Sequence, residues 1–250
     1  MSTSDQGELL RRKLDDAAFL CEKRGKPYFF PFLSEGEQLS CERYLKSRGF
    51  AGFTFFGGYE NAERRMLGLS AFEEIGEEAF PISALEFRFR PADKLTHRDF
   101  LGSLMALGLE RDTVGDILVE DGRCVVFVKS DIRDYVASQI TKIGRAGVRI
   151  LDASPDRLPE GRGFEELTVI VSSERLDAVV AAVSGLSREK TKNLILSGLV
   201  SLNFEQCTNI SRAVSGGDTL TVRGRGKYKI NGVTGETKKH RIKLSIIHYR

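Results

Sequence analysis

Hydrophobic positions near the start of the chain follow helical spacing. Apolar residues recur at three- and four-residue intervals over residues 8–24, which predicts an amphipathic helix, and a Gly and a Pro follow it as typical helix-ending residues. A second helix is expected over residues 34–47, because Ser34 and Glu37 have the spacing of a capping box.

Aromatic residues dominate the segment that follows. Residues 50–56 indicate a strand that ends at a Gly-Gly pair, and residues 61–65 are predicted to begin a third helix. Clustered rings can stack on nucleic-acid bases, but no basic residue lies between these rings. We therefore expect them to pack in the core of a small α/β domain over residues 1–79.

Strand and helix patterns follow the order β-α-β-β-α-β over residues 80–172, as in ferredoxin-like domains and RRM modules. The expected elements are strand 84–89, helix 96–107, strands 117–120 and 125–129, helix 132–143 and strand 167–172. These strands lack the aromatic signature that stacks RNA bases in RRM modules, so we expect an RRM-like domain without that chemistry. Residues 152–163, with several prolines and glycines, are expected to form a surface loop.

Two helices and several short strands are predicted for the C-terminal domain, residues 173–250. The first helix covers residues 174–184, and Ser187 is expected to cap the second, over residues 188–197. Short strands are expected at residues 200–203 and 219–223, and the latter continues into alternating glycine and basic residues. The fold class is therefore predicted to be α+β with three domains.

Charge is distributed unevenly along the chain. Residues 174–250 carry 14 Lys and Arg against 6 Asp and Glu, a net charge of +8. Residues 1–173 carry 24 against 29, a net charge of −5. A basic end on an acidic body points to a polyanionic partner such as nucleic acid, and the acidic domains are candidates for a protein contact.

Composition excludes several other classes of protein. The apolar runs are far shorter than the roughly 20 residues of a membrane span. The N-terminus has neither a signal-peptide nor a lipidation pattern, so a cytoplasmic location is expected. The four cysteines lack the paired spacing of metal ligands, so we expect reduced thiols, no zinc site and no cofactor.

The candidate binding chemistry lies in the basic domain. Arg188 and Lys192 are four residues apart and share a helix face, which suits them to bind RNA phosphates. Gly224 and Gly226 allow the backbone to approach RNA closely. The full set of candidate RNA-binding residues is Arg175, Ser187, Arg188, Lys190, Lys192, Asn193, Arg212, Arg223, Arg225, Lys227 and Lys229.

This C-terminal pattern closely resembles the S4 RNA-binding domain over about 50 residues. The residues that carry the resemblance are Arg175-Leu176-Asp177, Ser187-Arg188, Lys192-Asn193-Leu194-Ile195, Gly198, Val200, Asn203, Ser211, Val214, Gly217-Asp218, Leu220, Val222 and Gly224. One residue departs from the pattern, because Phe204 stands where many S4 domains have glycine.

The chain as a whole is similar to the bacterial YlmH-like proteins. The matching segments are Gly57-Gly58-Tyr59, Ala62-Glu63-Arg64-Arg65, residues 80–83, 95–102, 108–111, 115–117, 142–144 and 222–227, and the basic stretch 238–241. The resemblance implies a non-catalytic role at the large ribosomal subunit, with ribosomal RNA and tRNA as partners. It further implies that the protein engages stalled peptidyl-tRNA complexes in ribosome-associated quality control.

Catalytic motifs are weak by comparison. His97-Arg98-Asp99 is similar to a kinase catalytic loop, but Leu104 stands where that loop needs Asn, and we predict no catalytic set. Two alternatives stay open. One is an RNA-modifying enzyme, since S4 domains are often appended to pseudouridine synthases, and the other is a scaffold linked to cell division.

Overall fold

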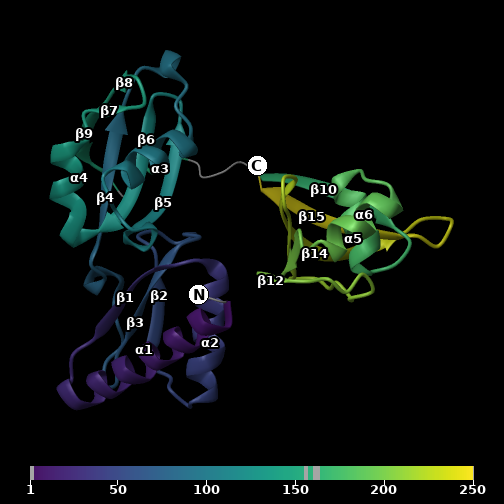
Figure 1. Ribbon diagram of the computed structural model, residues 1–250, viewed down its shortest axis with the longest axis horizontal. Helices are drawn as coiled ribbons and strands as arrows, with labels where there is room; N and C mark the ends of the chain where they lie inside the picture. The colour runs from purple at the N-terminus through teal and green to yellow at the C-terminus, as the bar shows by residue number, and fades with distance from the viewer. Residues whose placement is uncertain (1–2, 155–156, 160–163, 250) are drawn as a thin grey trace. The chain divides into compact units, whose positions relative to one another are not determined.

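The computed structural model describes residues 3–154, 157–159 and 164–249. The chain divides into two compact units, Met1–Gly161 and Arg162–Arg250, coloured purple to teal and green to yellow in Figure 1. The fold is mixed α+β with several small sheets, as predicted. Within the described ranges, no helix combines the length and the apolar character that a membrane crossing requires.

The first unit begins with a three-stranded sheet that two helices cover (Figure 1). The elements are α1 (Thr3–Arg24), β1 (Tyr28–Leu33), α2 (Glu35–Ser47), β2 (Phe53–Phe56) and β3 (Arg65–Leu69), with sheet order β1-β3-β2. Leu14 and Cys21 of α1 pack with Leu45 of α2 and Leu67 of β3. The predicted capping box of Ser34 and Glu37 is present at the start of α2. The two N-terminal helices are thus confirmed.

The helix predicted to begin at residues 61–65 is wrong. A turn occupies this position and leads into β3. The backbone N–H groups of Glu63 and Arg64 donate to the carboxylate of Asp116, at 2.7 and 3.0 Å, and the Tyr59 hydroxyl donates to it at 2.8 Å. Asp116 is buried, so these long-range hydrogen bonds satisfy its charge and hold the segment in a turn.

A four-stranded sheet with two helices forms the rest of the first unit. The elements are η1 (Glu77–Ala79), β4 (Ile82–Arg88), η2 (Pro91–Asp93), α3 (His97–Ala106), η3 (Arg111–Thr113), β5 (Val114–Glu120), β6 (Arg123–Lys129), η4 (Ser130–Ile132), α4 (Arg133–Gln139), β7 (Lys142–Ile143), β8 (Ala146–Gly147) and β9 (Arg149–Asp152). The sheet order is β5-β6-β4-β9, and all its pairs are antiparallel. Thr96 and Asp99 form a capping box at α3, where we predicted a cap.

Two predicted elements of this region need correction. The helix expected over residues 132–143 ends at Gln139, because Lys142 and Ile143 pair with β8 instead. The strand expected at residues 167–172 does not complete the β-α-β-β-α-β sheet; β9 does so by pairing with β4. Residues 167–171 belong to β10 in the second unit. Part of the surface loop predicted for residues 152–163 lies outside the described residues.

The four-stranded sheet is covered on both faces. Phe87, Val126 and Val128 pack with Phe100 and Leu104 of α3 on one face. On the other face, the core that contains Val125 and Phe127 joins Phe32 and Met66 of the N-terminal sheet. Tyr59 stacks on Phe127 with ring centroids 5.0 Å apart. The N-terminal aromatic residues therefore serve core packing, as predicted.

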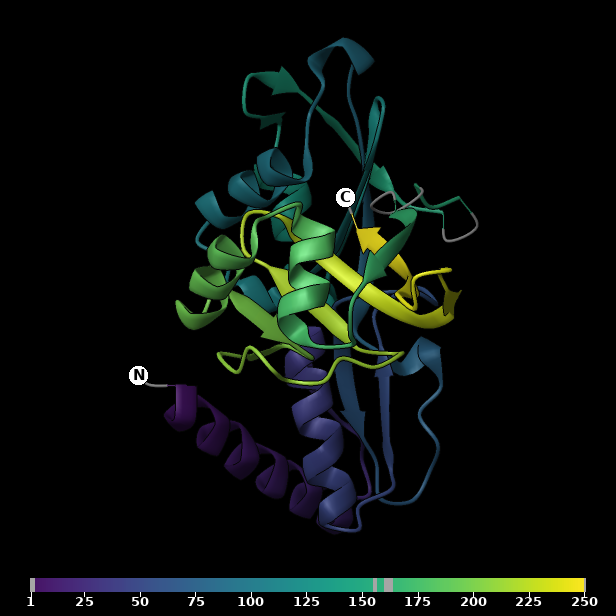
Figure 2. The ribbon, with the colours of Figure 1, turned by 90° about the vertical axis from the view of Figure 1, so that its right-hand side faces the viewer.

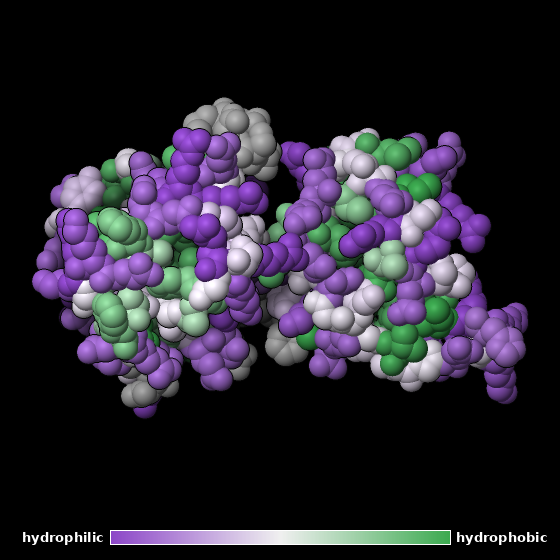
Figure 3. All heavy atoms as spheres, turned by 90° about the horizontal axis from the view of Figure 1, so that it is seen from below, coloured by the Kyte–Doolittle hydropathy of each residue, from purple (hydrophilic) through white to green (hydrophobic). Residues whose placement is uncertain are grey.

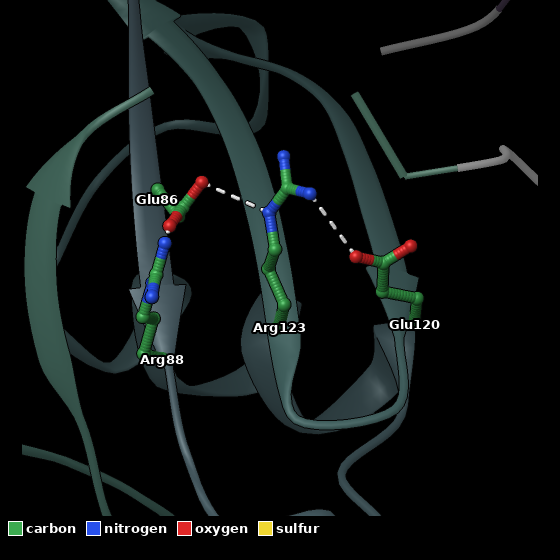
Figure 4. Close-up of polar contacts among 4 residues, drawn as sticks. All are labelled: Glu86, Arg88, Glu120 and Arg123. Atoms are coloured by element: carbon green, nitrogen blue, oxygen red, sulfur yellow. Dashed lines mark hydrogen bonds and ion pairs between the residues drawn. The ribbon is translucent and has the colours of Figure 1, made fainter. Parts of the chain in front are cut away.

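Charged residues at the rim of this sheet neutralise one another (Figure 4). Glu86 is buried and accepts hydrogen bonds from Arg88 Nε at 2.6 Å and Arg123 Nε at 2.9 Å. Burial alone would raise the pKa of Glu86, but these two arginines outweigh burial and hold the pKa below its ordinary value. Arg123 also pairs with Glu120 at 3.2 Å.

The four cysteines are free thiols, and three of them are buried. Burial raises the pKa of the Cys41 thiol to about 12. A thiol with a raised pKa stays protonated and unreactive at neutral pH, in line with the predicted reduced cysteines.

The second unit is a six-stranded antiparallel sheet with two helices on one face (Figure 2). The elements are β10 (Phe164–Val171), α5 (Leu176–Ser184), α6 (Arg188–Leu196), β11 (Val200–Leu202), β12 (Glu205–Gln206), β13 (Thr219–Val222), β14 (Gly226–Glu236) and β15 (Ile242–Tyr249). The sheet order is β10-β15-β14-β13-β11-β12. Val179 of α5 and Ile195 of α6 pack with Leu220 and Ile246 of the sheet. Both C-terminal helices were predicted.

Candidate nucleic-acid interface

A groove of about 620 Å³ in the second unit gathers several of the candidate residues. Its basic lining residues are Arg175, Arg188, Lys192 and Arg241. The rest of the lining is Asp177 together with small and apolar residues, among them Ala178 and Ala181 of α5 and Ile170 of β10. We call this feature the groove. The groove thus combines four cations with apolar and small side chains, which suits an anionic ligand.

Helix α6 explains why two of these cations face the groove. Ser187 caps the helix by accepting a hydrogen bond from the backbone N–H of Lys190, at 3.4 Å. The helix buries Thr191 and Ile195, and Arg188 and Lys192 flank this buried stripe. Lys190 and Asn193 are exposed and are not among the residues that line the groove.

Arg175 is held in place by a carboxylate. It precedes α5, and its guanidinium makes two hydrogen bonds to Asp177, each 3.1 Å long. The hydrogen bonds to Asp177 raise the pKa of Arg175, which stays charged. Because Asp177 also lines the groove, it offsets one of the four positive charges there.

Arg225 has an intramolecular role in addition to its charge. Its Nη1 donates to the backbone carbonyl of Ser184 at 3.2 Å, which ties the β13–β14 loop to the last turn of α5. Gly226 has a φ of 125°, and a Cβ atom there would lie 2.5 Å from Nε2 of His248. Packing inside the unit therefore accounts for this glycine, which the sequence had suggested serves close approach to RNA.

Lys227 and Lys229 lie on a different surface from the groove. They alternate along β14 with Tyr228 and Ile230, which are buried in the core beneath the helices. Neighbouring side chains of a strand point to opposite faces, so both lysines lie on the sheet face opposite α5 and α6. We call it the lysine face. Arg212 and Arg223 are exposed in loops and are not among the groove's lining residues.

Arg241 also lines the groove, although the sequence did not single it out as a candidate. This residue ends the turn between β14 and β15, which is closed by a hydrogen bond from Thr237 N–H to the Arg241 carbonyl, 2.8 Å long. The only sequence signal was its place in the basic stretch of residues 238–241.

On the molecular face drawn in Figure 3, hydrophobic side chains form small groups among hydrophilic ones.

Comparisons with known proteins found a matching family model and similar proteins. Residues 77–156 match the family described as "Putative RNA-binding domain in YlmH". The chain is 37% identical over 219 residues to "Ribosome-associated protein quality control protein P2" of Bacillus subtilis (strain 168), a match that covers 86% of this chain and 84% of that protein. A solved structure, "Cell division protein ylmH from Streptococcus pneumoniae", is similar with a TM-score of 0.49 at 21% identity, over 62% of this chain and 93% of that one.

Proposed function

Because the chain belongs to the YlmH family, we propose that it is a non-catalytic RNA-binding protein that acts at the large ribosomal subunit. There it engages stalled peptidyl-tRNA complexes in ribosome-associated quality control. The name of the Bacillus subtilis relative and the description of the matching family support this role. Its ligands would be ribosomal RNA and tRNA, and its place of action the cytoplasm.

The observation that carries the proposal is the convergence of four basic side chains in the groove. Arg175 and Lys192 come from the two helical segments, and Arg241 comes from a turn far along the chain. Cations fixed in this way can neutralise several RNA phosphates at once and release their counterions, which supplies affinity that depends strongly on salt. The groove needs no reacting group for this task.

We propose that the second unit is an S4 RNA-binding domain. The sequence predicts this domain over residues 173–250, and the β10–β15 pairing adds β10 at its N-terminal side. The order of α5, α6, β11 and β13 agrees with the segments that carry the S4 resemblance. In the same scheme, residues 1–79 form the N-terminal α/β domain, a candidate contact for a protein partner.

We also propose that residues 80–152 are RRM-like in strand order but do not stack RNA bases on their sheet. RRM modules bind RNA through aromatic residues on an exposed sheet face. Here Val125 and Phe127 are buried against the N-terminal sheet, so that face is occupied. Any RNA contact of the segment that matches the RNA-binding family would therefore use its loops and helices.

Ultraviolet crosslinking of the full chain in cells, followed by sequencing of the RNA and mass spectrometry of the peptides, tests the proposed function. We expect large-subunit ribosomal RNA and tRNA among the crosslinked RNAs. We expect the crosslinked peptides to come mainly from residues 164–249. Recovery of messenger RNA alone, or of peptides mainly from the first unit, would contradict the proposal.

A further inference from the structure

The turn between β11 and β12 contains an aromatic residue where the backbone favours glycine. Leu202 pairs with Glu205, so Asn203 and Phe204 form a two-residue hairpin loop. Both have positive φ values, 51° and 68°, as in a type I′ turn. Asn-Gly is the preferred pair for this turn, because side chains other than Asn are strained at positive φ.

Asn203 holds the turn without help from the aromatic ring. Its side-chain amide donates to Oδ1 of Asp218 at 2.7 Å, and its Oδ1 accepts from the backbone N–H of Thr219 at 2.9 Å. Its own N–H donates to the Thr219 carbonyl at 2.8 Å. These contacts fix the loop to β13. The bulky residue at position 204 is therefore not what keeps the hairpin closed.

The Phe204 ring lies at the surface beside a cation and a second ring. Phe204 is 37% exposed. Lys227 Nζ lies 6.0 Å from the Phe204 ring centroid and 4.9 Å from that of Tyr249. Lys227 and Tyr249 are directly paired across β14 and β15, so both lie on the lysine face. Backbone strain at an exposed aromatic residue suggests a binding role for it.

We propose that Phe204 stacks an unpaired base of the bound RNA, and that Lys227 contacts the phosphate beside this base. A ring next to an ammonium group matches both parts of a nucleotide, the flat base and the anionic phosphate. This inference rests on the proposed function and gives the second unit a contact distinct from the groove. The groove would hold backbone phosphates, whereas Phe204 would select RNA with an accessible base.

The test compares two RNAs and three variants of the full chain. The RNAs are a hairpin with an adenine loop and a fully paired duplex with the same stem. The Phe204→Gly variant removes the ring and relieves the positive-φ strain, so its folding stability should equal or exceed that of the wild type. Phe204→Leu keeps an apolar side chain without a ring, and Phe204→Tyr keeps the ring.

We expect Phe204→Gly and Phe204→Leu to weaken hairpin binding by about 5- to 100-fold, the loss for one stacked base. Duplex binding should stay unchanged, and so should the salt dependence of hairpin binding, because a ring neutralises no phosphate. The Phe204→Tyr variant should retain hairpin binding. A 2-aminopurine in the loop should be quenched by the wild type and less by the Leu variant.

Hairpin binding by Phe204→Leu at wild-type strength would overturn the inference, and so would equal weakening on both RNAs. If the wild type bound neither RNA, the proposed function itself would fail. If all variants bound hairpin RNA like the wild type but lost a protein partner, Phe204 would be a protein contact, and base stacking would be excluded.

Discussion

The two units of the molecule treat charge in opposite ways. In the first unit, Glu86 is buried between two arginines, and Asp116 is buried with three hydrogen-bond donors. In the second unit, Arg188 and Lys192 are exposed along one short helix and line the groove. Arginine and carboxylate side chains occur in both units, so the residue type alone does not tell a structural charge from a binding charge. A charge that is both paired and buried has a structural role, whereas an exposed charge in the groove is available to bind a ligand.

The four-stranded sheet of the first unit and the six-stranded sheet of the second also differ in how their two faces are covered. Both faces of the four-stranded sheet are packed, one against α3 and the other against the N-terminal sheet. In the six-stranded sheet, α5 and α6 share one face and Lys227 and Lys229 lie on the other. A sheet with both faces packed holds a unit together, whereas the lysine face has side chains that can meet a ligand.

The largest expected effect concerns Asp116. Replacing it with alanine leaves the Tyr59 hydroxyl and two backbone N–H groups without their acceptor, so we expect the first unit to lose about 3 kcal/mol of stability. Thermal unfolding measures the loss, and Asp16→Ala on the exposed side of α1 is the matched control. Groove-dependent RNA binding should survive below the lowered transition. If both variants lost the same stability, the claim that buried charges are structural and solvated charges are not would be contradicted.

A smaller effect is expected at Glu86. Its pKa is lowered in the fold, so its stabilising contribution is present above the ordinary pKa of glutamate and is lost as pH falls through the lowered value. We expect Glu86→Gln to destabilise the first unit by about 1–2 kcal/mol at neutral pH, with a much smaller difference at acid pH. Urea unfolding across pH measures this, and Glu120→Gln is the partly exposed control. If the stability difference between the wild type and Glu86→Gln did not change with pH, the lowered pKa of Glu86 would be contradicted.

The smallest effect concerns the carboxylate in the groove. Asp177→Asn removes the charge that offsets Arg175, so RNA affinity should rise by about two- to fivefold at low salt. Filter binding or fluorescence anisotropy measures the change, with Asp16→Asn in the first unit as the control. Weaker binding would show that Asp177 positions Arg175 rather than opposing RNA.

Local signals in the sequence predicted most helices of both units. Ser34 with Glu37 and Thr96 with Asp99 form capping boxes, and Ser187 caps α6, because each cap involves neighbours in sequence. Partners distant in sequence account for the failures. Hydrogen bonds to Asp116 hold residues 61–65 in a turn instead of a helix. Pairing with β15 makes β10 a strand of the second unit's sheet.

The candidate site shows the same limit. Helical spacing placed Arg188 and Lys192 together, and both line the groove with Arg175. Spacing along the chain does not reveal that Lys227 and Lys229 lie across the sheet from the helices, since that depends on which face of β14 the core covers. Spacing also does not predict that Arg241 lines the groove, because the position of this residue depends on the turn between the two long strands β14 and β15.

The salt dependence of RNA affinity tests the central claim, that the groove neutralises phosphates, most directly. In the full chain, Arg188→Glu with Lys192→Glu is compared with Lys13→Glu and Lys26→Glu, which make the same charge change at exposed sites in the first unit. We predict that the groove variant lowers the slope of log affinity against log salt by roughly 1.5–2 units and binds at least about tenfold more weakly. The control variant should match the wild type in slope. Equal slopes for the two variants would contradict the claim.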